Sequence, residues 1–170
     1  MNYQIETLAE TVKQRISGSP SGISCVFVSL DDDNGIKLFY SERERDKVYD
    51  AQAQCLAVGL APNLGQKVDL PTGSMRFGYI TEKVVVLYES GNNELGGLYT
   101  AWNEVENNCD DPDDYDYDPE TNPFKLVHDK LYADAGWDFQ DAHSKNWGIK
   151  KDGQIVPIDF GNDGFWMIDT

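Results

Sequence analysis

The stretch DAHSKNWGIKKDGQIVPIDFG, residues 141–161, holds the densest set of chemically useful side chains in the sequence. Asn146 follows Asp141 by five residues, and Asp159 follows Asn146 by thirteen. Transfer of a phosphoryl group requires a carboxylate that orients or deprotonates the accepting hydroxyl, together with oxygen ligands that hold Mg²⁺ against nucleotide phosphates. The intervening residues contain a Lys-Asp-Gly turn between two strand-like segments. They predict a hairpin that brings Asn146 and Asp159 together.

Two motifs in this stretch resemble those of the protein-kinase-like superfamily, including its small-molecule phosphotransferase branch. The catalytic loop of that branch often reads D-x-H-x-x-N, which residues 141–146 match, and an I-D-F-G turn follows a hairpin, as in residues 158–161. The resemblance extends over residues 18–163, almost the whole chain. It implies that Asp141 accepts the proton of the acceptor hydroxyl and that Asn146 and Asp159 hold Mg²⁺ beside ATP.

The same resemblance implies a lysine in the small lobe that contacts the nucleotide phosphates, and Lys37 in GIKLFY matches it. An acidic residue on the following helix should orient that lysine. Asp50 is the expected partner, and Glu44 is the alternative, although its spacing from Ser41 predicts a capping box. The Gly-rich phosphate loop of the family has only a thin counterpart in residues 18–22, which lack the middle glycine.

Adenine is held in this family by backbone hydrogen bonds from the strand and hinge that join the two lobes. Residues 78–84, GYITEKV, resemble that segment, so Glu82 and Val84 are expected near the cofactor. One departure from the family is Phe139, which stands where many kinases carry the histidine of H-R-D. We expect this change to be tolerated, because the ring keeps an apolar contact.

Hydrophobic spacing and turn residues upstream predict a small lobe of antiparallel strands with one packed helix. The Asn-Gly turn at residues 34–35 favours a hairpin, and the Ser41 capping box marks the start of the helix that follows. The expected elements are an N-terminal helix over residues 3–16, strands at 23–30 and 36–40, a helix over 41–60, and strands at 65–70 and 76–88.

The middle of the chain, residues 89–123, is expected to be an acidic insertion, and its residues 110–120 are expected to have no core. The segment DDPDDYDYDPE, residues 110–120, contains seven carboxylates and predicts a loop or mobile insertion. A helix over residues 124–135 and the catalytic hairpin then form an abbreviated second lobe, residues 124–170. Because nine residues follow Gly161, we expect no activation segment and no conventional platform for protein substrates.

Together these expectations describe one domain over residues 1–170: an α+β, reduced protein-kinase-like fold with a small lobe at 18–88. The chain has 14 basic and 30 acidic residues and a net charge of -16, which disfavours binding to nucleic acid or to anionic membranes. No apolar stretch is long enough to span a bilayer. Three widely spaced cysteines without a C-x-x-C motif favour a reducing, cytoplasmic location.

Two functional hypotheses follow. The first is a kinase-like protein that binds Mg²⁺ and ATP and transfers phosphate to a hydroxyl of a protein or small molecule. The second is a catalytically inactive, acidic regulator or decoy that binds a basic protein partner. Salt distinguishes the two, because capture by charge weakens steeply with ionic strength. The four tryptophans are expected in the core or between lobes, since stacking on nucleic acid needs a basic groove.

Overall fold

The computed structural model describes residues 3–15, 25–108, 111, 114–139, 143–160 and 165–167. It combines helices with antiparallel sheets, so the predicted α+β class is confirmed. The chain divides into two compact units. The first comprises Met1–Leu56 and Pro62–Lys83, and the second comprises Ala57–Ala61 and Val84–Thr170.

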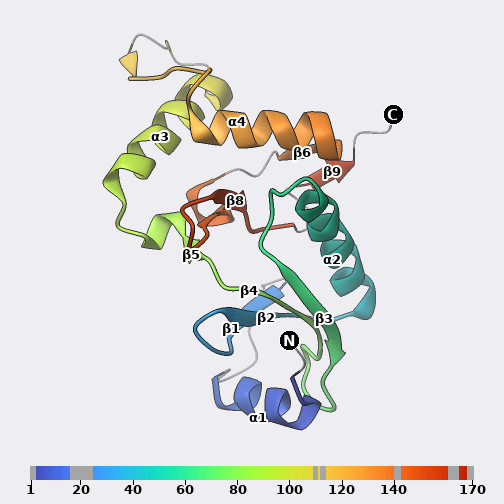
Figure 1. The fold of residues 1–170 in the computed structure, drawn as a ribbon. Helices are drawn as coiled ribbons and strands as arrows, with labels where there is room; N and C mark the ends of the chain where they lie inside the picture. Colours follow the sequence, from blue (N-terminus) through green and yellow to red (C-terminus); the bar gives the residue numbers. More distant parts are fainter. Residues whose placement is uncertain are drawn as a thin grey trace. The chain divides into compact units, whose positions relative to one another are not determined.

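The first unit is an antiparallel sheet with a helix on each face (Figure 1). The four strands lie in the order β1-β2-β4-β3. The predicted helices and hairpin are confirmed here. The elements of this unit are α1 (Ile5–Arg15), β1 (Cys25–Ser29), β2 (Asn34–Phe39), α2 (Glu42–Ala57), β3 (Leu64–Asp69) and β4 (Phe77–Glu82).

Alternation along the strands gives the two faces of this sheet different partners. One face packs Ile36 and Leu38 against Leu8 and Val12 of α1. The other face carries Tyr79 and meets α2. The start of α2 is fixed by the predicted capping box, because Glu44 N donates to Ser41 Oγ over 3.2 Å and Ser41 Oγ donates to Glu44 Oε2 over 3.1 Å.

The second unit contains the remaining helices and two small antiparallel sheets, β5-β7-β8 and β6-β9. Its principal helices, α3 and α4, lie beside the β7-β8 hairpin (Figure 1). Its elements are β5 (Val85–Val86), the 3-10 turn η1 (Leu87–Glu89), α3 (Asn93–Asn107), α4 (Pro123–Lys130), the π-helical turn η3 (Leu131–Ala135), β6 (Trp137–Phe139), the 3-10 turn η4 (Ser144–Asn146), β7 (Trp147–Ile149), β8 (Ile155–Pro157) and β9 (Phe165–Met167).

Aromatic rings form the core of the second unit. Phe124 and Trp147 meet edge to face with centroids 5.1 Å apart, and Trp102 stacks on Phe124 at 6.2 Å. All three side chains are buried, and Trp137 is buried as well. The prediction that the tryptophans lie in the core is confirmed for Trp102, Trp137 and Trp147. The side chain of Trp166 lies outside the described residues.

Two sequence predictions are wrong in this region. Residues 89–123 are not a loop throughout, because α3 occupies Asn93–Asn107 and buries Trp102. Residues 76–88 are not one strand either. The strand ends at Glu82, and Val85 begins a short strand in a different sheet. The residues before and after this break belong to different units, because the first unit ends at Lys83 and the second resumes at Val84.

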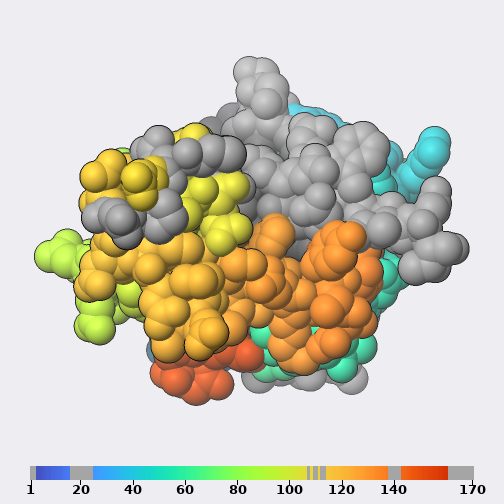
Figure 2. Space-filling view, turned by 90° about the horizontal axis from the view of Figure 1, so that it is seen from above, coloured from blue at the N-terminus to red at the C-terminus, as the bar shows by residue number. Residues whose placement is uncertain are grey.

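The surface formed by α4 and by the chain between α3 and α4 is visible in orange and yellow in Figure 2. Asn122 caps α4, since its Oδ1 accepts from Phe124 N at 3.0 Å and from Lys125 N at 3.2 Å. Within the described ranges, no helix combines the length and apolar character needed to cross a bilayer.

Candidate functional site

The two predicted magnesium ligands lie at the same end of the β7-β8 hairpin. Trp147 pairs with Pro157 across the two strands, and Ile158 N donates to Asn146 O over 2.9 Å just beyond that pair. Asp159 is the next residue along the chain. The predicted hairpin is therefore confirmed, and it brings the backbones of Asn146 and Asp159 together.

Asn146 is buried and its amide is oriented by a neighbour. Its Nδ2 lies 3.3 Å from His143 Nε2, a contact in which the amide nitrogen can only donate. The geometry turns the amide nitrogen toward His143 and the amide oxygen away from it. The contact with His143 thus positions a candidate ligand.

These donors fit a magnesium ion. Mg²⁺ prefers hard oxygen ligands and is commonly held by one or two carboxylates together with water and nucleotide phosphates. Asn146 and Asp159 supply an amide and a carboxylate oxygen. Within the described ranges no group of three or more His, Cys, Asp or Glu side chains could hold a metal by itself. The predicted base, Asp141, lies outside the described residues.

Val84, the predicted adenine contact, packs on the same hairpin. A methyl group in place of the Gly148 hydrogen would lie 2.5 Å from Val84 Cγ2 and 2.6 Å from Ile158 Cγ2. The strand that begins at Val85 pairs antiparallel with β7, with Val85 opposite Ile149. Among the described residues, the backbone N–H and C=O of Val84 make no hydrogen bond. They are suited to bind a ligand edge.

Glu82 has a different environment from Val84. Its N–H donates to Asn63 O over 2.8 Å, and its Oε2 accepts from Asn63 N over 2.9 Å. The next amide, that of Lys83, donates to Asp33 O over 2.7 Å. Both N–H groups are used within the first unit. A backbone donor for adenine is therefore expected at Val84 and not at Glu82.

Lys37 lies on the sheet face that carries Tyr79, because the two residues are directly opposite on β2 and β4. Phe27 is opposite Lys37 on its other side. The Phe27 ring is 44% exposed and covers Gly35, where a Cβ would lie 2.1 Å from Phe27 Cζ. A half-exposed aromatic ring thus lies next to the predicted phosphate-binding cation, a juxtaposition that sequence analysis did not identify.

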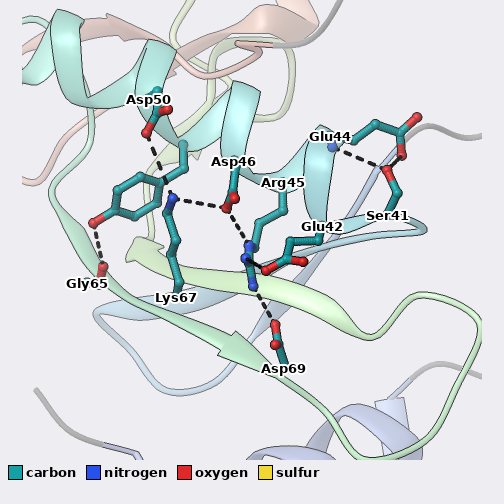
Figure 3. Close-up of polar contacts among 10 residues, drawn as sticks. Ser41, Glu42, Glu44, Arg45, Asp46, Asp50, Gly65, Lys67 and Asp69 are labelled. Atoms are coloured by element: carbon teal, nitrogen blue, oxygen red, sulfur yellow. Dashed lines mark hydrogen bonds and ion pairs between the residues drawn. The ribbon is translucent and has the colours of Figure 1, made fainter.

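The predicted partner of Lys37 contacts another lysine. Asp50 Oδ1 lies 3.8 Å from Lys67 Nζ, and its side chain is 68% exposed (Figure 3). Lys67 is also opposite Tyr79, on the side away from Lys37. Glu44 contacts Ser41, as its capping box requires. The pairing of Lys37 with Asp50 remains a prediction.

A network of charges surrounds Asp50 on α2 (Figure 3). The side chain of Arg45 is 6% exposed and is bound by Glu42, Asp46 and Asp69. Asp46 receives hydrogen bonds from Arg45 Nε at 2.9 Å and from Lys67 Nζ at 3.0 Å. The bond from Arg45, followed by that from Lys67, lowers the pKa of Asp46 below its ordinary value.

A buried polar network links α2 to β4. Gln52 is fully buried, accepts from Tyr79 Oη at 2.8 Å, and donates to Thr81 Oγ1 at 2.8 Å and Pro62 O at 2.9 Å. Thr81 Oγ1 in turn donates to Asn63 O over 3.2 Å. The i, i+3, i+7 spacing of Arg45, Val48 and Gln52 is the sequence signal for this buried face of α2.

Comparison of the chain with protein-family models, curated proteins and solved structures finds no match in any of the three.

Proposed function

We propose that this protein binds a nucleoside triphosphate with Mg²⁺ and transfers phosphate to a hydroxyl, as a small, abbreviated member of the kinase-like class. The observation that carries the proposal is the small sheet β5-β7-β8. One end of it carries Val84, whose backbone N–H and C=O make no hydrogen bond with the described residues, and the other end carries Asn146 and Asp159. Continuing the register of β5 and β7, Val84 lies opposite Lys150. Lys150 is four residues from Asn146, which corresponds to roughly 13 Å along an extended strand. That spacing suits a nucleotide from base to phosphates.

Each residue then has a defined role. Val84 binds the edge of the base through its backbone, and Lys37 neutralises phosphate charge. Asn146 and Asp159 hold Mg²⁺, which neutralises charge on the phosphates when it is bound. His143 positions the Asn146 amide. Asp141 accepts the proton of the acceptor hydroxyl.

The strongly negative charge of the chain makes nucleotide binding depend on cations. At a net charge of -16, the protein repels a polyanionic nucleotide unless cations are present at the site. Nucleotide binding should therefore depend strongly on Mg²⁺. We also infer a cytoplasmic location, supported by the odd number and wide spacing of the three cysteines and by the lack of a C-x-x-C motif.

Calorimetric titration of ATP with and without Mg²⁺ tests the proposal. Wild-type protein should bind ATP in the presence of Mg²⁺, and Asp159→Ala should abolish that binding. Asp152→Ala is the matched control, because Asp152 is an exposed aspartate at the turn of the same hairpin, where it accepts from Gln154 N at 3.0 Å. Phosphate transfer, followed with labelled ATP, should be lost in Asp141→Asn.

Two outcomes would contradict the proposal. One is the absence of ATP binding by wild-type protein under either condition. The other is Mg²⁺-dependent binding that survives in Asp159→Ala as fully as in the control. The first outcome would favour the alternative of an inactive, acidic regulator, whose binding to a basic protein should weaken as salt rises.

A further inference from the structure

A pocket in the second unit is separate from the residues assigned above. It has a volume of about 390 Å³ and lies between η1, the first turns of α3 and η4. The side chains that define it are Tyr88, Asn92, Tyr99, Thr100 and Ser144. This volume is within the usual range for small-molecule sites, about 300–1,000 Å³. A molecule of the size of a monosaccharide or disaccharide would fit.

The lining of this pocket is uncharged, which is unusual for this chain. Charged residues make up 26% of the sequence, and the net charge is -16, yet none of the nine residues lining the pocket carries a charge at neutral pH. The lining residues themselves offer no cation to an anionic ligand and no carboxylate to a cationic one. The pocket therefore favours a neutral ligand.

Two tyrosine rings give the pocket aromatic surface. Tyr99 is held rigidly by Phe124, with ring centroids 5.5 Å apart, and by Trp102, at 6.1 Å. The Tyr88 ring is 68% exposed, and Lys145 Nζ lies 5.4 Å from its centroid. Rings of this kind offer an apolar face and a polar hydroxyl to the same ligand.

Hydrogen-bonding groups accompany the rings. Asn92 caps α3 with its oxygen, which accepts from Leu95 N at 3.0 Å. The Asn92 amide nitrogen has no partner among the described residues. Thr100 donates to Gly96 O over 2.9 Å, which leaves the lone pairs of its hydroxyl as acceptors. Amide and hydroxyl groups beside aromatic faces are suited to a ligand that carries several hydroxyls.

Gly96 leaves one side of the pocket without a side chain. It lies in the interior of α3, where glycine is among the least favourable residues. Its neighbour Gly97 is equally unfavourable there, and a Cβ on either residue would meet nothing within 4 Å. Packing therefore does not require these glycines. Gly96 lines the pocket and Gly97 does not, so a side chain at Gly96 alone would enter the ligand space.

We propose that this pocket binds an uncharged, polyhydroxylated small molecule such as a sugar or cyclitol, with the bare backbone at Gly96 keeping the space open. This proposal does not depend on nucleotide binding, and its test requires neither ATP nor Mg²⁺. If the proposed function also holds, the bound molecule supplies the acceptor hydroxyl, an extension that rests on that function.

The probes are glucose, myo-inositol and maltose, each titrated into the full chain and followed by saturation-transfer NMR. At least one should bind saturably to wild-type protein. Gly96→Leu should weaken that binding by about tenfold or more, while the matched variant Gly97→Leu should stay within about twofold of wild type. Tyr88→Leu, at a position that is 68% exposed, should also weaken it. Glucosamine and glucose 6-phosphate should bind more weakly than glucose.

The proposal is overturned if none of the three neutral probes binds to wild-type protein. It is also overturned if Gly96→Leu and Gly97→Leu bind the probe equally well, or if glucose 6-phosphate binds more tightly than glucose. Thermal unfolding of each variant establishes that it is folded before binding is compared.

Discussion

Gly148 lies directly against Val84, with 2.5 Å between the position of a Gly148 Cβ and Val84 Cγ2. This contact fixes the residue that precedes β5 against the strand that leads from Asn146. The same Gly148 Cβ position would lie 2.6 Å from Ile158 Cγ2. One glycine thus allows the candidate base-binding backbone and the candidate metal-binding hairpin to form a single packed sheet.

Replacement of Gly148 by alanine should destabilise the protein. The added methyl would overlap both branched side chains, and overpacking of this kind costs about 1–3 kcal/mol. Urea unfolding should show a lower midpoint with an unchanged slope. Gly97→Ala is the control of opposite sign, because its methyl enters open space on a helix and should stabilise by up to about 1 kcal/mol. A Gly148→Ala variant as stable as wild type would contradict the packing described here.

Gln52→Leu should be strongly destabilising despite its added apolar surface. The substitution leaves the hydroxyl of Tyr79, the hydroxyl of Thr81 and the carbonyl of Pro62 without their buried partner. We expect a loss of about 2–3 kcal/mol in the free energy of unfolding. Arg43→Leu, at an exposed position on the same helix, should change it by less than about 0.5 kcal/mol. Equal effects from the two variants would refute a structural role for the network.

Asp46 should contribute to acid sensitivity. Hydrogen bonds from Arg45, and then from Lys67, lower its folded pKa below the ordinary 3.8, so the deprotonated form favours the folded state. This contribution is present above pH 3.8 and is lost as the pH falls through the lower folded pKa. The difference in unfolding free energy between wild type and Asp46→Asn should therefore shrink between about pH 7 and about pH 3. A difference that stays constant over this range would exclude the mechanism.

Local signals in the sequence predicted several elements correctly. Asp31 Oδ1 accepts from Asp33 N at 2.8 Å and from Asn34 N at 2.7 Å, so the acidic turn closes the first hairpin within a few residues. The Ser41 capping box and the turn at residues 151–153 act over the same short range. Such features depend on neighbours in the chain and can be read without knowledge of the fold.

Helix α3 could not be predicted in this way. Its sequence, NELGGLYTAWNEVEN, contains two glycines and lies next to an acidic segment, which favours a loop. It is helical because Tyr99 and Trp102 pack against Phe124 and Trp147, residues that follow much later in the chain. Burial of these rings outweighs the low helix propensity of the two glycines.

The sequence by itself determined the hairpin that pairs Asn146 with Ile158, since the turn and the strands are contiguous. Only the tertiary structure decided that Val84 packs on Gly148, that Asp50 meets Lys67, and that Gly96 opens into a pocket. The physical reason is that contacts between distant segments depend on which faces are buried together. That choice is made by the packing of whole elements and leaves no short-range pattern.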